Sequence, residues 1–427
     1  MSAPTFAEAV RVWARIGCLS FGGPAGQIAL MHREIVEQRK WLDEPDYLNA
    51  LNFCMLLPGP EAMQLATYAG WRLHGVRGGL AAGLLFVLPG ALVVLALTMA
   101  YAAFGRLAPV EAAFVGIKAA VLVIVVEALL RIARRALHAA AHWTIAAAAF
   151  VGIFLFEAPF PLIVGAAAAI GFALAPQRRA DGPAEPWPSP RRTLATLGLW
   201  LAVWLVPLGL LWALLGGGHV LAEIGAFFSM LAVVTFGGAY AVLAYMAQAA
   251  VETHGWLDAG EMLDGLGLAE TTPGPLILVT EFVGYLGAAR SGGEASLLRG
   301  LAGAAVTLWA TFAPCFLWVF AGAPYVQRIA RAPRLRAALQ GITAAVVGVI
   351  LNLSLWFGLH VLAPGIQERA TGPLRWWTLP PDGIDPVAAV LAAVAAVALL
   401  ALHQGVLRTL VLCGGLALAW YALQAPG

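Results

Sequence analysis

Apolar stretches about twenty residues long recur along this chain, and they restrict what it can fold into more than any other feature of the sequence. A helix that crosses a bilayer needs roughly 20 mostly apolar residues. Only 11% of the 427 residues are charged, whereas a soluble domain has about 25%, so water cannot be the only solvent. The stretches cover residues 80–103, 110–130, 143–174, 194–215, 221–250, 300–322, 337–360, 385–402 and 405–423.

These stretches are expected to be helices, because a bilayer admits only helices or closed barrels and the stretches lack the alternating pattern of barrel strands. The stretch 143–174 is interrupted by Glu157-Ala158-Pro159 and predicts two short helices. The sequence therefore predicts an all-α polytopic membrane protein with about 10 to 13 transmembrane segments, some of them broken or re-entrant. The lipid bilayer is its first partner.

Several functional classes receive no support from the sequence. The net charge of +2 and the lack of a large basic cluster argue against nucleic acid as a partner. The N-terminus shows no pattern of a removable signal peptide. The histidines form no pair four residues apart with a carboxylate between its members, so no catalytic residue, metal or cofactor is expected. The four cysteines have no disulfide or zinc spacing: Cys18, Cys54, Cys315 and Cys413.

Three motifs occur twice, each pair 215 residues apart, which indicates an internal duplication. Phe21-Gly22-Gly23 returns as Phe236-Gly237-Gly238, Trp41-Leu42-Asp43 as Trp256-Leu257-Asp258, and Pro58-Gly59-Pro60 as Pro273-Gly274-Pro275. Further along, the spacing becomes 225, as for Gly116-Ile117 and Gly341-Ile342. The predicted organisation is an N-terminal repeat (1–175), a proline-rich cytoplasmic linker (176–193), a connecting helix (194–215) and a C-terminal repeat (216–427).

Basic residues change sides between the two repeats. The loops 33–40 and 131–135 carry six Lys or Arg residues, whereas their counterparts 248–255 and 356–360 carry none. Because short cytoplasmic loops collect Lys and Arg, and because the connecting helix adds one crossing, the second repeat is expected to be inverted relative to the first. Inverted repeats are typical of secondary transporters, which bind their substrate where the repeats meet.

The paired Pro-Gly-Pro motifs interrupt apolar segments and predict broken helices. Pro60 and Pro275 suit the first turn of a new helix, which leaves the next three amides of each without intrahelical partners. Such a helix N-terminus is a partial positive pole that binds anions. The alternative is a re-entrant hairpin or kink with only a packing role. The amides concerned belong to Glu61, Ala62, Met63, Leu276, Ile277 and Leu278.

A second paired element lies at the Phe-Gly-Gly motifs. Ser20 and Thr235 precede them and offer matching hydroxyls, and the glycines permit close approach of the backbone. Substrate contact is one interpretation, and helix packing is the other.

Few charged residues lie within the apolar segments. Lys118 can balance an anion or extend to the membrane surface. Glu270, just before Thr271 and Thr272, and Glu281 in the following helix can carry a coupling proton or pair with an arginine.

The first half resembles the repeated domain of the chromate ion transporter family, long two-domain type. The resemblance rests on Phe21-Gly22-Gly23-Pro24, His32-Arg33-Glu34, Trp41-Leu42, Leu57-Pro58-Gly59-Pro60, Gln64 and Phe86-Val87-Leu88-Pro89. The second half is similar to that family's C-terminal domain through Phe236-Gly237-Gly238, Trp256-Leu257 and residues 269–275. Two departures are Glu281, where Gln or an apolar residue is expected, and the missing proline after the second Phe-Gly-Gly.

The resemblance implies proton-motive export of chromate across the bacterial inner membrane, which confers chromate resistance, with sulfate as a related oxyanion. An oxyanion carrier of other specificity and an anion channel remain as alternatives, and a homo-oligomer is compatible with the sequence. The duplicated motifs and the resemblance together give these candidate substrate-binding residues: Ser20, Gly22, Gly23, Pro58, Gly59, Pro60, Gln64, Lys118, Thr235, Gly237, Gly238, Thr271, Thr272, Pro273, Gly274 and Pro275.

Overall fold

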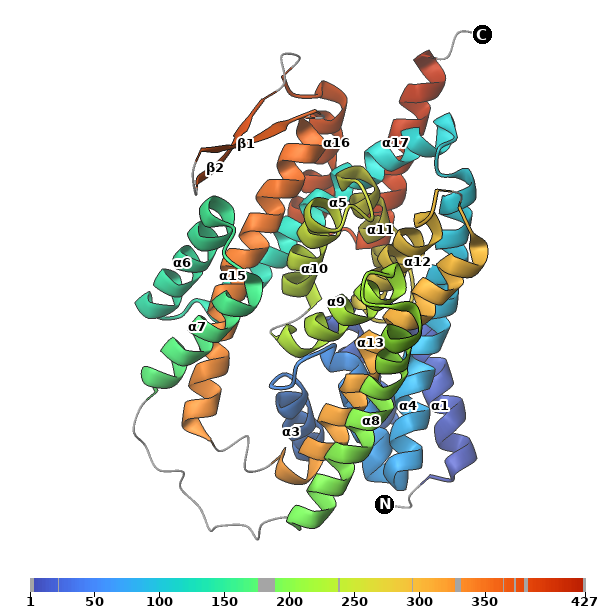
Figure 1. Cartoon of the computed structure of the whole chain (residues 1–427), viewed down its shortest axis with the longest axis vertical. Helices are drawn as coiled ribbons and strands as arrows, with labels where there is room; N and C mark the ends of the chain where they lie inside the picture. Colours follow the sequence, from blue (N-terminus) through green and yellow to red (C-terminus); the bar gives the residue numbers. More distant parts are fainter. Residues whose placement is uncertain are drawn as a thin grey trace. The chain divides into compact units, whose positions relative to one another are not determined.

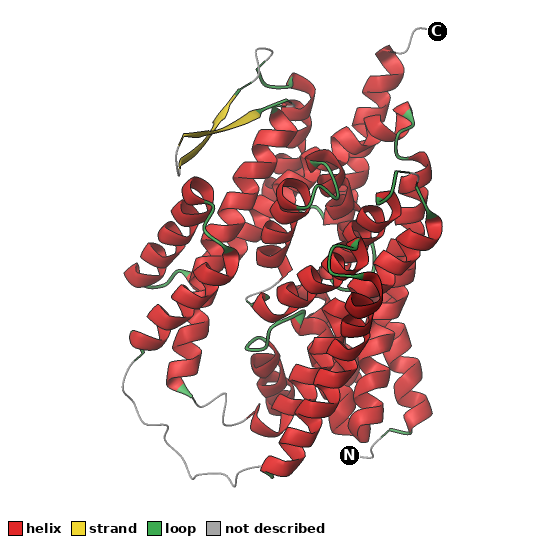
Figure 2. Cartoon of the chain, viewed as in Figure 1, coloured by secondary structure: helices red, strands yellow, loops and turns green. Residues whose placement is uncertain are grey.

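The chain is almost entirely helical (Figure 2). The structure is a computed structural model that describes residues 4–21, 23–175, 189–236, 239–293, 295–326, 332–363, 365–371, 374–379 and 383–424. It forms two compact units, each assembled from three separate parts of the chain. Unit 1 contains residues 1–96, 174–242 and 272–339, and unit 2 contains 97–173, 243–271 and 340–427.

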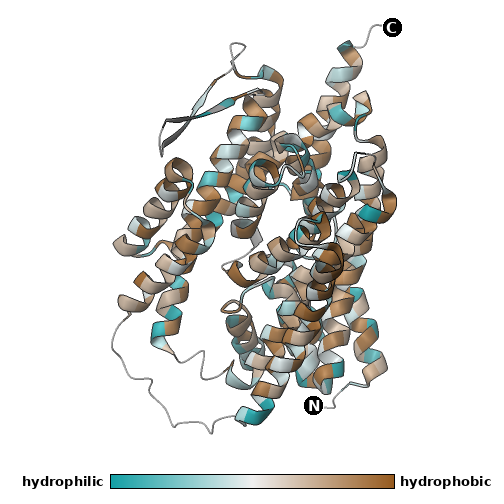
Figure 3. Cartoon of the chain, in the orientation of Figure 1, coloured by the Kyte–Doolittle hydropathy of each residue, from teal (hydrophilic) through white to brown (hydrophobic). Residues whose placement is uncertain are grey.

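Among the described residues, six helices are long and apolar enough to cross a membrane, and four shorter helices are also apolar. Apolar colouring accordingly dominates the helices in Figure 3. This confirms the all-helical polytopic fold. The six are Glu61–Phe104, Ala108–Ala136, Pro190–Leu215, Leu297–Tyr325, Pro333–Leu362 and Val406–Gln424, and the four are Ala140–Phe156, Phe160–Ala173, Val220–Val234 and Pro386–Ala401.

Unit 1 begins with the first helices of the chain, which Figure 1 draws in blue. Asp43 caps α3, since its carboxylate accepts a hydrogen bond of 2.8 Å from the amide of Asp46. The helices are α1 (Phe6–Leu19), α2 (Gly23–His32), the π-helix η1 (Arg33–Gln38), α3 (Glu44–Cys54) and α4 (Glu61–Phe104), of which α4 continues past residue 96 into unit 2.

Helix α4 is a hairpin rather than one straight rod. Its backbone is not helical at His74 and Gly75, where φ is −138° and +62°. A Cβ placed on Gly70 would lie 2.6 Å from the Cβ of Ala82, although twelve residues of straight helix span about 18 Å. The segment from Glu61 to Leu73 therefore folds back on the segment that follows Gly75. The sequence predicted only the second arm, as the stretch 80–103.

The second repeat supplies the matching hairpin in unit 1. Helix α12 packs against α13, and a Cβ placed on Gly303 of α13 would lie 2.5 Å from that of Ala288 in α12. The remaining elements of unit 1 are the connecting helix α8 (Pro190–Leu215) and, from the second repeat, α9 (Val220–Val234), the start of α10 (Ala239–Gln248), the 3-10 helix η3 (Leu276–Leu278), α12 (Val279–Arg290), α13 (Leu297–Gly322), η4 (Ala323–Tyr325) and the start of α15 (Pro333–Leu362).

Local backbone geometry repeats with the spacing of 215 residues, which confirms the duplication. A π-helix occurs at η1 and again at η2 (Ala249–Thr253). After each of them one residue has a positive φ, 52° at Lys40 and 60° at Gly255. Next, the amide of Trp41 donates to the carbonyl of Ile35 over 2.8 Å, as Trp256 does to Ala250 over 2.9 Å.

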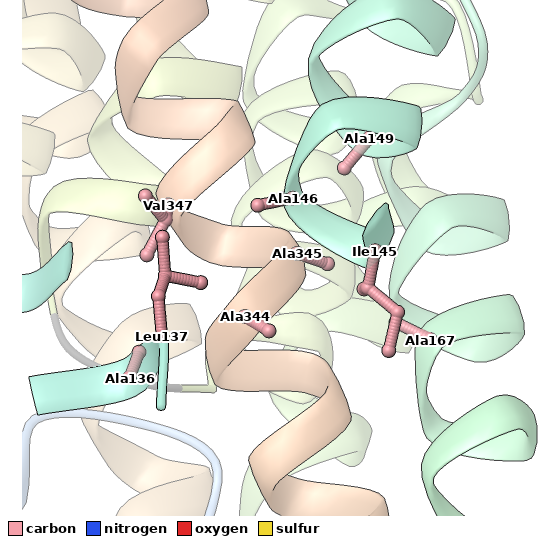
Figure 4. Packing of buried hydrophobic residues seen from close by; sticks show 9 residues of the cluster. All are labelled: Ala136, Leu137, Ile145, Ala146, Ala149, Ala167, Ala344, Ala345 and Val347. Carbon is pink, nitrogen blue, oxygen red and sulfur yellow. The ribbon is translucent and has the colours of Figure 1, made fainter. Parts of the chain in front are cut away.

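Unit 2 packs small side chains tightly. A cluster formed by the end of α5, by α6, α7 and the later part of α15 is rich in alanine (Figure 4). Gly348 of α15 has no room for a Cβ beside the backbone of Ala146, and small residues of this kind allow helices to approach closely in membranes. The helices of unit 2 are α5 (Ala108–Ala136), α6 (Ala140–Phe156), α7 (Phe160–Ala173), η2, α11 (Ala259–Thr271), α16 (Pro386–Ala396), η5 (Val397–Ala401) and α17 (Val406–Gln424), together with the ends of α4, α10 and α15.

Three structural features can be compared with the sequence analysis. The interruption after α6 is confirmed, with Glu157 in the left-handed conformation at φ 50°. Helix α8 begins at Pro190, four residues earlier than expected, and residues 176–188 of the linker lie outside the described residues. A two-stranded antiparallel sheet of β1 (Gln367–Thr371) and β2 (Leu374–Thr378) was not predicted.

The shift of basic residues between the repeats predicts the side on which each loop lies. After the native cysteines are replaced, a single cysteine at Arg39 should be reached by an impermeant thiol reagent only from the cytoplasm, and one at His254 only from outside. Labelling in intact cells and in inverted vesicles measures this. Labelling of both positions from the same side would refute the inverted arrangement.

Candidate functional site

Two Pro-Gly-Pro breaks lie in unit 1, one in each repeat. Gly59 and Gly274 have φ values of 116° and 95°, which side-chain-bearing residues rarely adopt. Helix α4 starts directly after Pro60, and its first internal hydrogen bond runs from the amide of Gln64 to the carbonyl of Pro60 (3.1 Å). Within the described residues, the amides of Ala62 and Met63 have no acceptor, whereas the amide of Glu61, the third that the sequence singled out, donates to the carboxylate of Glu61 itself.

The second break differs from the prediction at one amide. The amide of Leu278 donates to the carbonyl of Pro275 over 2.9 Å, because η3 is a 3-10 helix and closes its first turn one residue earlier than an α-helix does. Leu278 therefore offers no free amide. The first break instead opens directly into α-helix, with the acidic side chain of Glu61 in the first turn.

Each break is bound to the end of a helix from the other repeat. The amide of Gly59 donates to the carbonyl of Thr235 at the end of α9, and the amide of Gly274 donates to the carbonyl of Ser20 at the end of α1. Both distances are 2.8 Å. Reciprocal contacts of this kind are typical of a two-fold arrangement, in which a residue of one repeat makes the same contact with the second repeat as its counterpart makes with the first. The two repeats thus interlock at the predicted motifs.

The hydroxyls of Ser20 and Thr235 stabilise the helix ends in this interlock. Ser20 Oγ donates to the carbonyl of Ile16 over 2.6 Å, and Thr235 Oγ1 donates to that of Leu231 over 2.5 Å. Both residues are buried, at 0% and 2% exposure. Because both hydroxyl protons are used in these hydrogen bonds, the two hydroxyl oxygens can only accept further hydrogen bonds in this arrangement.

Two buried glutamines of the first repeat form hydrogen bonds with the two breaks, one glutamine with each break. Gln64 Nε2 donates to the carbonyl of Pro58 (2.7 Å), and Gln27 Nε2 donates to that of Gly274 (2.6 Å). A carbonyl only accepts, so the nitrogen of each carboxamide must face it. The residues 215 positions further on are Val242 and Val279, which make no hydrogen bonds through their side chains. Sequence analysis identified Gln64 but missed Gln27, whose signal was a glutamine within an otherwise apolar helix.

A small cavity of about 10 Å³ adjoins the first break. Gly59 and Pro60 line it together with the hydroxyl-bearing residues Thr235, Thr280 and Thr311. Thr311 is 4% exposed, and its hydroxyl has no hydrogen-bond partner among the described residues. The remaining lining residues are apolar: Phe228, Leu231, Ala232 and Ile277. The cavity therefore combines a helix N-terminus with an unused buried donor.

Apolar residues occupy the corresponding positions beside the second break. By the repeat spacing, Thr280 corresponds to Leu65 and Thr311 to Phe86, and both of these residues are 0% exposed. The two sides of the interlock are therefore chemically different. Ser20 and Thr235 give each side one hydroxyl, and the side at the start of α4 has two more, from Thr280 and Thr311. No motif had indicated these two, because Thr280 and Thr311 lie outside the duplicated sequences.

Lys118 belongs to unit 2, where it pairs with a residue that sequence analysis missed. Its Nζ lies 3.4 Å from Oδ1 of Asp264 on α11, and the hydroxyl of Tyr101 donates to Oδ2 of Asp264 over 2.8 Å. The side chain of Asp264 is only 6% exposed. Asp264 escaped notice because α11 is short and less apolar than the spanning segments.

The other predicted residues have more varied positions. Glu281, in α12 of unit 1, is 1% exposed, and its Oε2 has no hydrogen-bond partner among the described residues. Thr272 is buried in unit 1, whereas Thr271, in unit 2, donates to the carbonyl of Leu268 over 2.8 Å.

Gly23 begins α2 with a φ of 72°. Glu270 is the penultimate residue of α11, and Gly22, Gly237 and Gly238 lie outside the described residues.

Known proteins that resemble the chain over most of its length are transporters. A probable chromate transport protein of Synechococcus elongatus is 30% identical over 397 residues, which are 91% of this chain and 94% of that protein. A chromate transport protein of Cupriavidus metallidurans is 31% identical, over 82% of each chain. One of Pseudomonas aeruginosa is 32% identical, over 79% of this chain and 77% of its own. No solved structure matches the chain.

The family comparison covers both repeats. The family model described as chromate transporter matches residues 7–172 and 222–420, so each match contains one Pro-Gly-Pro break and one Phe-Gly-Gly motif. The chain belongs to the chromate transporter family.

Proposed function

We propose that this protein exports chromate from the bacterial cytoplasm across the inner membrane, driven by the proton-motive force, and so confers chromate resistance. Three of its relatives are named as chromate transport proteins, one of them as a probable one. A tetrahedral oxyanion is a hydrogen-bond acceptor on all sides, so its site must consist of donors. Sulfate is bound by the same donors and is the second candidate substrate.

The cavity at the start of α4 is the observation that carries this proposal. There the hydroxyl of Thr311 supplies a buried donor in a cavity that Pro60 also lines, and α4 begins after Pro60 with the free amides of Ala62 and Met63. Thr235 and Thr280 can turn their hydroxyls from backbone carbonyls toward the anion. Helix N-termini and hydroxyls bind oxyanions without a full positive charge, which also allows their release.

The small size of the cavity supports alternating access. A volume of about 10 Å³ holds roughly one water molecule and not a tetrahedral oxyanion. Substrate entry therefore requires the hairpins that begin at the breaks to move apart from the helix ends that hold them. Such a movement strains two hydrogen bonds, the one between Gly59 and Thr235 and the one between Gly274 and Ser20. In an alternating mechanism, the bond at one break is strained first and the bond at the other break afterwards.

The remaining candidates take supporting roles in this proposal. Glu281 lies on the helix that follows the second break, and its buried carboxylate repels a dianion unless it carries a proton. Glu270, Thr271, Thr272 and Pro273 lead into that break and transmit its movement. The glycines of the Phe-Gly-Gly motifs, Gly22, Gly23, Gly237 and Gly238, stay candidates for substrate contact on sequence grounds, because glycine allows close approach of a backbone.

Transport into inverted vesicles tests the proposal. Vesicles that contain the protein should take up radiolabelled chromate with saturation, and an imposed gradient that is acidic inside should increase the amount accumulated. Flux that does not saturate and follows only the electrochemical gradient of the anion would indicate a channel. Uptake of sulfate that excess chromate does not inhibit would assign the site to another oxyanion.

A further inference from the structure

We propose that Asp264, together with Lys118 and Tyr101, forms the site that binds and releases the coupling proton. The inference rests on the transport function proposed above and adds the residue at which the proton is carried. All three residues belong to unit 2 and come from different helices: Tyr101 from α4, Lys118 from α5 and Asp264 from α11.

The geometry is that of a buried carboxylate with one cationic and one neutral donor. Asp264 Oδ1 lies 3.4 Å from Lys118 Nζ, and Oδ2 accepts a hydrogen bond of 2.8 Å from the hydroxyl of Tyr101. The side chains of Asp264 and Lys118 are 6% and 26% exposed. The ammonium is therefore the wetter partner and gives the carboxylate a route for proton exchange.

This cluster breaks the symmetry of the duplicated chain. By the repeat spacing, Asp264 corresponds to Asn49, Lys118 to Thr343 and Tyr101 to Val326, so none of the three chemical groups recurs. The carboxylate is contributed by the second repeat and the ammonium by the first. A buried charged pair costs desolvation energy and is weak evidence of a role in stability, whereas charged groups within membrane proteins mark ion and proton pathways.

The neighbouring charges favour a proton over a metal cation. A sodium or other metal ion at Asp264 would meet the ammonium of Lys118 at close range, whereas a proton neutralises the carboxylate and releases that ammonium. Asp258 and Glu261, at the start of α11, are the other carboxylates that act on this cluster. Helix α17 also packs against α11, and its one charged residue, Arg408, is exposed.

Protonation can be passed on to the second break through α11. Gly267 of α11 has no room for a Cβ beside Ile117 of α5, so the two helices are in close contact one turn beyond Asp264. The chain leaves α11 at Thr271 and reaches the break at Pro273. Loss of the Asp264 to Lys118 attraction on protonation therefore loosens the segment that leads to Gly274.

The test separates proton-driven accumulation from exchange. A transporter that cannot release its proton still exchanges labelled for unlabelled substrate, because exchange needs no net proton movement. Since coupling between sites is typically worth 5- to 150-fold, D264N should lower chromate accumulation driven by a pH gradient by about tenfold or more. Exchange at equal chromate on both sides should fall by less than about threefold, a change of under 1 kcal/mol. Reconstituted vesicles measure both rates.

Two variants guard against trivial outcomes. E127Q removes a carboxylate that pairs with Arg131 on the same helix, α5, and should leave accumulation and exchange as in the wild type. The double variant D264N/K118M removes both charges, so no unpaired buried charge remains, and it should restore abundance if D264N is poorly inserted.

The outcomes distinguish this inference from the proposed function. A parallel loss of accumulation and exchange in D264N at normal abundance, or no loss of either, would overturn the inference, as would a selective loss of accumulation in E281Q alone. If the wild type itself moves no chromate, the proposed function fails instead. If the wild type moves chromate without any response to the pH gradient, there is no coupling proton and the inference falls while transport remains.

Discussion

Gly90→Ala should reduce chromate transport by about a hundredfold, because the added methyl group has no room beside the second break. Its Cβ would lie 3.0 Å from the Cα of Gly274 and against the carbonyl of Pro273, which is backbone and cannot rotate away. Displacing this break strains the hydrogen bonds that Gly274 makes with Ser20 and Gln27. Two buried hydrogen bonds are together worth about 2 to 3 kcal/mol, and about 2.7 kcal/mol corresponds to a hundredfold change in an equilibrium constant.

A second glycine provides the matched control. Gly209→Ala changes another helical glycine of unit 1, in α8, but a Cβ there meets no atom within 4 Å. It should transport as the wild type does and, if anything, gain up to about 1 kcal/mol of helix stability. Initial rates in vesicles of equal protein content and thermal unfolding of the purified variants measure both effects. Normal transport by Gly90→Ala would show that the second break tolerates displacement.

Thr311→Val should raise the KM for chromate by about ten- to a hundredfold, because a hydrogen bond to a charged group is worth about 1.5 to 3 kcal/mol. Valine has nearly the same shape, and the hydroxyl that it removes has no partner among the described residues. The change should therefore preserve or slightly raise the thermal stability while it weakens substrate binding.

Thr311→Ser tests whether the hydroxyl is responsible. Serine keeps the donor and loses only a methyl group, so its KM should stay within about threefold of the wild type, less than about 1 kcal/mol. Concentration series of chromate uptake give KM and maximal rate for each variant. Equal KM values for valine and wild type would remove Thr311 from the site, and a fall in stability in both variants would point to packing instead.

The repeat and its breaks were predictable because they rest on local chemistry. Pro-Gly-Pro cannot continue a helix, and its return at the same spacing as Trp-Leu-Asp made both breaks visible in the sequence. The contacts between Gly59 and Thr235 and between Gly274 and Ser20 were not predictable in this way. The spacing tells which residues correspond, but not which end of one repeat packs on the other.

The chemistry inside the site depended on contacts that a single sequence does not reveal. Thr311 lies in a long apolar helix and attracts attention only when its hydroxyl is found buried, without a partner among the described residues and beside a helix N-terminus. Gln27 and Asp264 act on residues far along the chain, Gly274 and Lys118. Lys118 was found from its position within an apolar stretch, but its partner lies on a helix that the hydropathy pattern did not identify.

A chromium anomalous difference map, from crystals of the protein soaked in chromate, tests most directly whether the oxyanion is held at the first break. The expected result is a peak within about 3 Å to 4 Å of the hydroxyl of Thr311 and next to the amides of Ala62 and Met63, with the peak reduced in Thr311→Val. A strong peak elsewhere, such as beside Lys118, with no density between Gly59 and Thr311, would contradict the account.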